Sequence, residues 1–179
     1  MNDFMNYIET GQIDFSEGHL KLFDQSMVMF PTTTYLNLYR KCTALGEPGR
    51  KIIYDIGYEQ IKAVFAVYEK NYNVSQMNAD EFIKLFGPSV LICGWGNLNY
   101  AQLKYNIGEK IIVKLENNPF AIMYKKLFKH QKRGVDDFLL GLFSGGFSCI
   151  AGHKIIGKET KCIAKGDDIC EFELELVAD

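Results

Sequence analysis

A chain of 179 residues, 47% of them hydrophobic, can bury one sizeable core, and this length favours one domain over two. The 20 Lys and Arg residues nearly balance the 22 Asp and Glu residues, and the net charge of −2 is too small to favour nucleic acid or an anionic membrane surface as a partner. We therefore expect a single domain over residues 1–179, with a short lead segment at residues 1–11.

The N-terminal residues do not resemble an export signal, and no stretch approaches the ~20 apolar residues that span a bilayer. The five cysteines are an odd number, which in a chain without such a signal does not suggest a disulfide framework. We expect a cytoplasmic protein without a membrane span, whose cysteines are free thiols or metal ligands.

The chain opens with the pattern of a small hairpin followed by a helix. Two short apolar stretches within residues 12–30 flank the turn-forming residues Asp24 and Gln25, which predicts a β-hairpin. Apolar residues then recur at helical spacing from Thr32 onward. The glycines and proline of residues 46–49 are expected to end this helix.

Two further helices are predicted in the first half of the chain. Residues 50–72 carry apolar side chains along one helical face, although Gly57 is expected to loosen the middle of this helix. A shorter helix is predicted over residues 78–93, with an N-cap at Asn78. Gly87 and Pro88 should kink or split it.

The second half of the chain changes to strand periodicity. Residues 97–116 alternate with a period of two and predict a hairpin, and the break at residues 117–119 precedes a polar, basic segment. A helix should follow Gly134, and two strands joined at residues 166–168 should end the chain. This order predicts an α+β fold, with a helical layer packed on a twisted four-stranded antiparallel sheet and an N-terminal β-hairpin.

The helix after Gly134 is rich in small residues. Gly141, Ser144, Gly145 and Ser148 are three or four positions apart and therefore share one face. A neighbouring backbone or a ligand could approach this face closely. The simpler interpretation is tight packing of the helix on the sheet.

The final hairpin holds the densest group of reactive side chains, Glu159, Cys162 and Cys170. Zinc takes thiolate and carboxylate ligands, and two paired strands can bring the two cysteines together. In a regular strand Glu159 and Cys162 point to opposite faces, so both can reach one ion only at a bulge or a strand end. Burial of the cysteines in the core is the alternative, because free cysteine is often buried.

Residues 134–177 resemble the C-terminal signature of the 4-vinyl-reductase domain family. This signature has a helix with glycine and serine, a strand ending in Glu-x-x-Cys, a turn with Gly-Asp, and a second Cys followed by an apolar residue. The matching positions are Gly141, Ser144, Gly145, Gly152, Glu159, Cys162, Gly166, Asp167 and Cys170. The chain departs from the pattern at Glu171, which separates Cys170 from the apolar Phe172.

The resemblance implies a structural zinc site. In the phenol-sensing members of this family, the Glu and both Cys of the motif bind zinc with a further Cys at the start of the preceding helix. By that resemblance Glu159, Cys162 and Cys170 are candidate ligands, and Asp136 stands at the fourth position. A carboxylate binds zinc less tightly than a thiolate does. Cys149, further along the same helix, is the alternative fourth donor.

The resemblance also implies a function. Domains of this family share a fold with vesicle-tethering subunits and resemble haem-based nitric oxide sensors, several of which hold a guest between helices and sheet. We therefore expect a domain that binds or senses a small apolar, aromatic or hydrocarbon molecule. The side chains expected to line its pocket are Phe65, Trp95, Tyr100, Phe138 and Phe147.

Two other classes of function stay open. The first is an enzyme or accessory protein that acts on a tetrapyrrole vinyl group, although the chain lacks a dinucleotide-binding fingerprint and no catalytic residue is assigned. The second is an assembly protein, a homodimer whose interface would use the helices at residues 50–72 and 78–93. A sensor without its own output domain would also need a partner protein for signalling.

Overall fold

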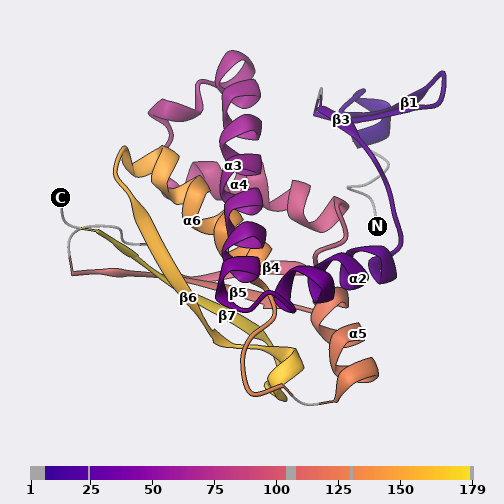
Figure 1. Ribbon diagram of the computed structural model, residues 1–179. Helices are drawn as coiled ribbons and strands as arrows, with labels where there is room; N and C mark the ends of the chain where they lie inside the picture. The colour runs from indigo at the N-terminus through magenta and orange to yellow at the C-terminus, as the bar shows by residue number, and fades with distance from the viewer. Residues whose placement is uncertain (1–6, 24, 104–107, 130, 178–179) are drawn as a thin grey trace. The chain divides into compact units, whose positions relative to one another are not determined.

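The computed structural model describes residues 7–23, 25–103, 108–129 and 131–177 of the chain (Figure 1). The chain forms two compact units, residues 1–31 and residues 32–179. Among the described residues, the structure contains no helix with the length and hydrophobicity needed to cross a bilayer. All five cysteines lie in the described part of the chain, as free thiols.

The first unit is a small antiparallel sheet with the strand order β1-β2-β3. Its strands are β1 (Ile13–Ser16), β2 (His19–Leu22) and β3 (Gln25–Met27). The predicted N-terminal hairpin is confirmed as β2–β3, and β1 is a strand that the sequence did not predict. Glu17 and Gly18 join β1 to β2 with φ angles of 51° and 79°, the left-handed geometry that a two-residue hairpin turn favours.

The second unit has a helical layer and a four-stranded sheet. Its helices are α2 (Thr32–Thr43), α3 (Glu47–Tyr72), η1 (Val74–Gln76), α4 (Ala79–Ile92), α5 (Pro119–Phe128), α6 (Asp137–Ala151) and η2 (Ile163–Lys165). Its strands are β4 (Asn97–Leu103), β5 (Lys110–Glu116), β6 (Ile155–Lys161) and β7 (Cys170–Leu176), in the antiparallel order β4-β5-β7-β6. The predicted α+β fold is confirmed.

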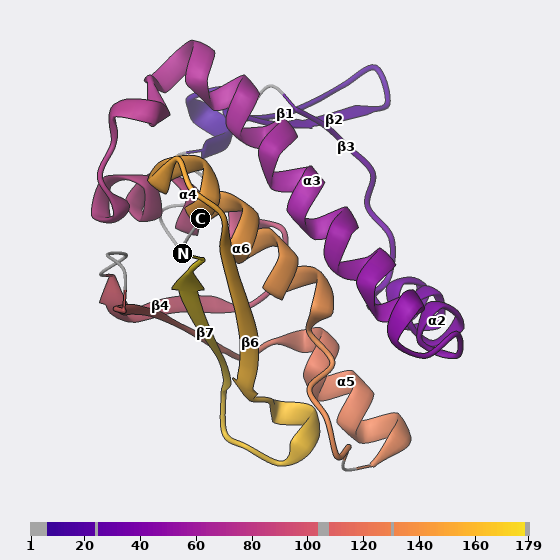
Figure 2. The same ribbon diagram turned by 60° about the vertical axis from the view of Figure 1, so that its left-hand side comes forward.

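Alternation along β5 and β7 builds the core of the sheet. Val113 pairs with Phe172, Leu115 pairs with Cys170, and all four side chains are fully buried. Phe143 of α6 packs its ring against that of Phe172, with the centroids 5.1 Å apart. Helix α6 thus covers this sheet, and it lies between the sheet and α3 (Figure 2).

The small-residue face of α6 packs against α3, so the expectation that it packs on the sheet is wrong. A Cβ atom at Gly141 would overlap the carbonyl oxygen of Tyr54, and one at Gly145 would lie 2.6 Å from Cγ2 of Ile61. Gly57 of α3 returns this contact, because a Cβ there would overlap the carbonyl oxygen of Phe138. Gly57 therefore brings two helices together and does not loosen α3.

Helix α4 begins as predicted but does not split. Asn78 caps it, since its side chain accepts from the backbone N–H of Glu81 at 3.0 Å while the Glu81 carboxylate accepts from the N–H of Asn78. The helix continues through Gly87 and Pro88 to Ile92. Burial of one face of α4, which includes Phe82, offsets the hydrogen bond that proline removes.

Helix α5 was missed by the sequence analysis, which predicted only a break and a polar segment. Asn118 accepts hydrogen bonds from the N–H groups of Phe120 and Ala121 at 3.0 and 3.2 Å and so caps the helix, and Pro119 takes its first position. Both signals were present in the sequence. The break at Asn117 is real, but a helix starts directly after it.

Candidate functional site

The four candidate metal ligands meet where α6 begins and where the β6–β7 hairpin turns. One ligand atom from each of Asp136, Glu159, Cys162 and Cys170 lies within 4.8 Å of the other three. Sγ of Cys162 is 3.8 Å from Oδ2 of Asp136. We refer to these four residues as the acid–thiol cluster. Cys149, the alternative donor, does not belong to this group of described residues.

An irregularity in β6 explains how Glu159 and Cys162 reach the same place. The pairing of β6 with β7 shifts register between Glu159 and Lys161, and Cys162 lies just beyond the last residue of β6. A bulge adds one residue to one strand, which changes the face to which the following side chains point. The conflict that regular alternation raised is thereby removed.

Gly134 gives Glu159 its place in the cluster. A Cβ atom at position 134 would overlap the Glu159 carboxylate, so only glycine leaves room for it. Oε2 of Glu159 accepts a hydrogen bond from the backbone N–H of Asp136 at 3.1 Å. Oε1 of Glu159 is buried and has no hydrogen-bond partner within the part of the chain that the structure describes.

Asn118 is a fifth polar residue at this place, and the sequence analysis did not single it out. Its side chain is fully buried, and Nδ2 donates to Oδ1 of Asp136 at 2.9 Å. The same Nδ2 lies 3.8 Å from Sγ of Cys170. The Asn-Pro pair before an apolar run was the available signal, because it marks a helix start.

Burial governs the ionisation of the cluster. Burial, and next the nearby Asp136, raise the pKa of Glu159 to about 12. Burial also raises the pKa of Asp136. A hydrogen bond with Cys170 lowers the pKa of Cys162, and the same bond together with burial raises the pKa of Cys170. Acids that lie side by side with so little water favour keeping their protons unless a cation joins them.

The cluster fits a divalent ion of tetrahedral geometry. Zinc holds sulfur at about 2.3 Å and oxygen at about 2.0 Å, which sets neighbouring ligand atoms roughly 3.5 Å apart. The separation of 3.8 Å between Sγ of Cys162 and Oδ2 of Asp136 is close to this value. The unpaired Oε1 of Glu159 is a buried acceptor that such an ion would satisfy.

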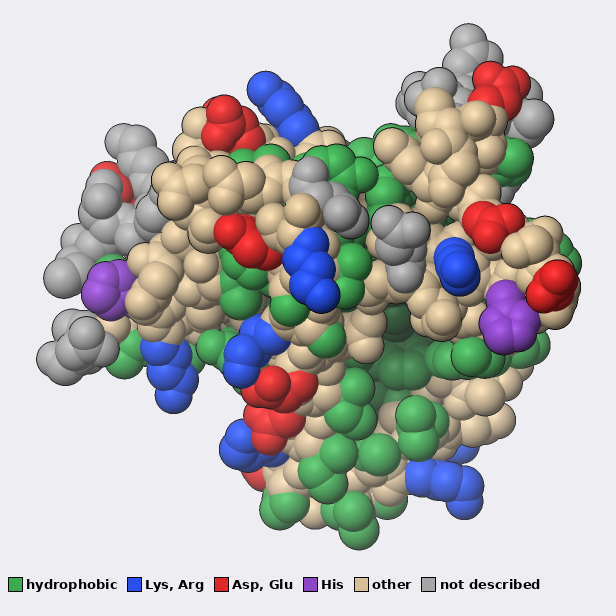
Figure 3. Space-filling view, turned by 90° about the horizontal axis from the view of Figure 1, so that it is seen from above, with side chains coloured by type: hydrophobic (Ala, Val, Ile, Leu, Met, Phe, Trp, Pro, Cys, Tyr) green, Lys and Arg blue, Asp and Glu red, His purple; other side chains and the backbone are tan. Residues whose placement is uncertain are grey.

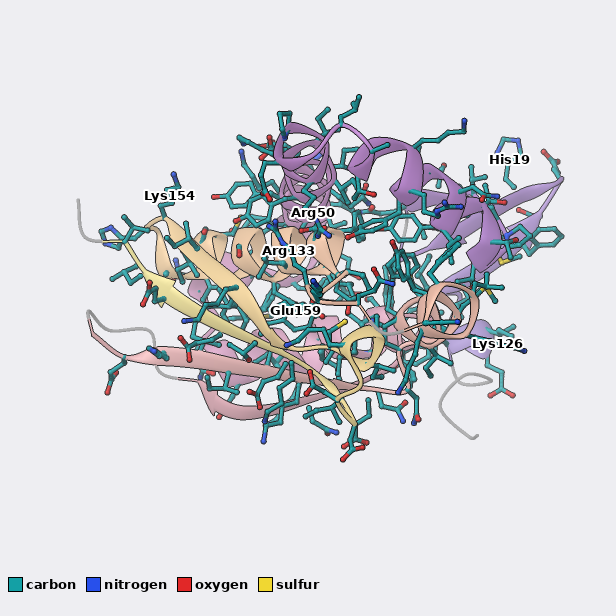
Figure 4. All side chains as sticks on the ribbon, turned by 60° about the horizontal axis from the view of Figure 1, so that its bottom comes forward. His19, Arg50, Lys126, Arg133, Lys154 and Glu159 are labelled. Carbon is teal, nitrogen blue, oxygen red and sulfur yellow. The ribbon has the colours of Figure 1, made fainter. Side chains whose placement is uncertain are left out.

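A second polar network adjoins the cluster. Nη1 of Arg50, in the first turn of α3, donates to Oδ2 of Asp137 at 2.7 Å and to the carbonyl oxygen of Gly134 at 3.1 Å. Tyr39 of α2 donates its hydroxyl to the same Oδ2 at 2.7 Å. Figure 4 shows Arg50, Arg133 and Glu159 on one side of the unit, around the start of α6.

An aromatic cluster lies next to these polar residues. Its centre is Tyr35 of α2, whose ring centroid is 5.4 Å from Trp95, 4.7 Å from Phe120 and 6.1 Å from Phe138. Trp95 stacks on Phe138 at 5.2 Å. We call Tyr35, Tyr39, Trp95, Phe120, Tyr124 and Phe138 the aromatic cluster.

Tyr35 brings a phenol group into this ring of aromatic side chains. Burial raises the pKa of Tyr35 well above its ordinary value, and the carboxylates of Asp136 and Asp137 add to the rise. The hydroxyl therefore keeps its proton and can donate a hydrogen bond to a polar atom of a ligand. The sequence analysis did not single out Tyr35 as a site residue, because its pattern there is that of an ordinary residue on an amphipathic helix.

The five residues predicted to line a pocket do not all come together. Trp95 and Phe138 are in contact, as described. Phe65 faces Phe82, with the centroids 6.1 Å apart, and Phe147 is buried on α6. The side chain of Tyr100 lies outside the described residues.

Residues 128–176 match the family model of the 4-vinyl-reductase domain. This range contains the acid–thiol cluster and α6. The resemblance to 4-vinyl-reductase domains that the sequence indicated is therefore confirmed for this part of the chain.

A curated relative is an uncharacterized protein of Methanocaldococcus jannaschii, 27% identical over 127 residues. The alignment covers 70% of this chain and 56% of that protein, so the chain spans little more than half of the relative's length. The crystal structure of a vinyl-4-reductase family protein from the same organism is 23% identical, with a TM-score of 0.55 and coverage of 85% of each chain.

The phenol-responsive sensory domain of the transcription activator PoxR, solved with phenol, has a TM-score of 0.79 at 18% identity. The match covers 97% of this chain and 89% of that one. Two further structures share the fold at 13% identity, as the family resemblance implied. They are a trafficking protein particle complex subunit 3 from Naegleria fowleri (TM-score 0.59, 82% and 93% coverage) and an H-NOX protein from S. oneidensis (TM-score 0.53, 97% and 90% coverage).

Proposed function

We propose that this chain, which carries the 4-vinyl-reductase domain signature, binds a small aromatic or apolar molecule and acts as a sensing domain. The observation that carries the proposal is the likeness of 97% of the chain to a sensory domain solved with phenol. The acid–thiol cluster is the second part of the proposal, as a structural zinc site.

The aromatic cluster supports an aromatic ligand. It offers ring faces and edges from three helices and from Trp95, and aromatic pairs at such separations add about 0.5–1.5 kcal/mol each. Tyr35 adds a protonated hydroxyl next to these rings. A ligand with one aromatic ring and one hydroxyl would match both the apolar and the polar features.

Zinc is the metal proposed for the acid–thiol cluster, because two thiolates favour it over magnesium or calcium. Asp136, Glu159, Cys162 and Cys170 would hold it. A bound ion would supply a structural cross-link between the start of α6 and the β6–β7 hairpin. Asp136 directly precedes α6, so the cross-link would fix the helix that carries Phe138.

Fluorescence of Trp95 tests the ligand proposal, since it is the only tryptophan in the chain. Phenol titrated into the purified protein should change its emission with a saturable dependence. Tyr35→Phe should weaken phenol binding but leave benzene binding near that of the wild type. The absence of saturable binding for phenol, benzene and a medium-length alkane would contradict the proposal.

Native mass spectrometry tests the zinc proposal on freshly purified protein. One equivalent of zinc is expected, and Cys162→Ser and Cys170→Ser should each remove it. Cys149→Ser is the matched control, because this thiol lies on α6 outside the cluster, and it should keep the metal. A metal-free wild type that also fails to take up added zinc would make the cysteines ordinary core residues.

Self-assembly is a second candidate function, favoured by one observation. Large hydrophobic side chains are exposed on α2, on α3 and between them, at Leu38, Leu45, Ile52 and Ile56. A homodimer could cover such side chains. Sedimentation of the wild type and of an Ile52→Glu, Ile56→Glu variant tests it, since a monomeric wild type would exclude this candidate.

The other expectations stay predictions. No observation on the described residues favours a tetrapyrrole vinyl reductase over a binding domain. A partner protein for signalling and a cytoplasmic location rest on the sequence arguments alone. On the face seen in Figure 3, acidic and basic side chains are scattered among hydrophobic ones without a large patch of one sign, which agrees with the small net charge.

A further inference from the structure

We propose that Asn118 is a positioning residue for the metal, which makes Asp136 a ligand through a single oxygen. This inference rests on the proposed zinc site and adds a residue to it that lies outside the four candidate ligands. It concerns the two oxygens of one buried carboxylate, which the structure places in different surroundings.

The two oxygens of Asp136 have separate partners. Oδ1 accepts a hydrogen bond from Nδ2 of Asn118 at 2.9 Å, and Oδ2 lies 3.8 Å from Sγ of Cys162. Oδ1 is thereby occupied, and Oδ2 is the oxygen that faces another candidate ligand. Hydrogen bonds from residues around a metal site fix the orientation of its ligands in this way.

The position of Asn118 is itself fixed. Its Oδ1 accepts from the backbone N–H groups of Phe120 and Ala121, so the amide cannot rotate without uncapping α5. Because Oδ1 is held by two N–H groups, Nδ2 must point toward Asp136 and Cys170. The side chain is fully buried, so a lost hydrogen bond here would not be replaced by bulk water.

Asn118 also joins the proposed metal site to the aromatic cluster. The Phe120 N–H that it holds belongs to the residue whose ring is 4.7 Å from that of Tyr35. On the other side, Asp136 is two residues from Phe138, which stacks on Trp95. A change in the hold on Asp136 should therefore reach the rings of the proposed ligand site.

The test is a double-mutant cycle on zinc affinity, measured by competition with a chelator. Asn118→Ser keeps an N-cap oxygen for α5 but its hydroxyl is too short to replace Nδ2. It should lower the zinc affinity of the wild type by about 10- to 100-fold. In an Asp136→Cys background the same change should cost less than about 3-fold, because a thiolate has one donor atom and needs no such partner.

The readouts separate the two levels of the proposal. Equal losses in both backgrounds would show that Asn118 acts only by holding α5, and would overturn the inference while leaving the zinc site intact. A wild type that binds no zinc would instead overturn the proposed metal site. If Asn118→Ser does not fold, Asn118→Gly gives the same comparison, since glycine is tolerated as an N-cap and has no donor side chain. The visible spectrum of the Co²⁺-loaded proteins should change with Asn118→Ser only when Asp136 is present.

Discussion

Arg50 and Asp137 form an ion pair, Nη1 to Oδ2, of 2.7 Å that joins the first turn of α3 to the first residue of α6. Their side chains are only 18% and 15% exposed. Tyr39 of α2 donates to the same carboxylate oxygen, so three helices meet at one charged atom. Asp137 follows Asp136 directly, and this pair therefore borders the proposed metal site.

Arg50→Met should destabilise the protein by about 2 kcal/mol, because it leaves the carboxylate of Asp137 partly buried without its cation. Lys51→Met is the control. The pair between Lys51 and Asp55 is exposed to solvent, and its loss should cost less than about 0.5 kcal/mol. Urea denaturation of the two variants measures both values, and similar midpoints would refute the structural role of Arg50.

Gly141→Ala should destabilise the protein by at least about 2 kcal/mol, because the added methyl would overlap the backbone carbonyl of Tyr54 on α3. Gly146→Ala adds the same methyl to the same helix, but its nearest neighbour is Cγ1 of Ile61 at 3.3 Å, the part of a side chain that can shift. The higher helix propensity of alanine should offset that contact, which gives a change within about 1 kcal/mol. Thermal and urea denaturation would contradict this packing if both variants were equally stable.

Tyr68 should make the stability of the protein depend on alkaline pH. Burial raises its pKa to about 12, and its hydroxyl lies 3.0 Å from Oγ of Ser89. A pKa raised above the unfolded value of about 10 means that this contribution is present below pH ~10 and is lost as pH rises through ~12. Tyr68→Phe should remove that part of the decline, by up to about 1.4 kcal/mol per pH unit. Unfolding free energies between pH ~9 and ~11 that fall with equal slopes in both proteins would be the opposite result.

Gly134→Ala should weaken zinc binding by about 10-fold or more, because the new methyl would displace the carboxylate of Glu159. The control is the same substitution in a Glu159→Ala background, where no carboxylate remains to be displaced and no further loss is expected. Chelator competition measures all four proteins. A loss that persists in that background would place the cause in the backbone at residue 134.

Local patterns determined most of the elements. The period-two alternation of Phe172 and Leu174 predicted β7, and Asn78 predicted the start of α4, because alternation and capping depend on residues close in sequence. The same rules would have placed α5 after Asn118 and Pro119, had they been applied there. The small residues of α6 correctly indicated close packing, but their partner proved to be α3, since spacing along one helix does not identify its neighbour.

The sequence by itself determined the chemistry of the candidate site, because Glu159, Cys162, Cys170 and Asp136 can be named from the residue types and the family resemblance. Only the tertiary structure decided that their ligand atoms lie within 4.8 Å of one another. That meeting depends on the register shift in β6 and on the tight fit of Glu159 against Gly134, which arise from packing between distant segments. Asn118 became visible for the same reason, since 18 residues separate it from Asp136 and 52 from Cys170, and no local pattern spans such distances.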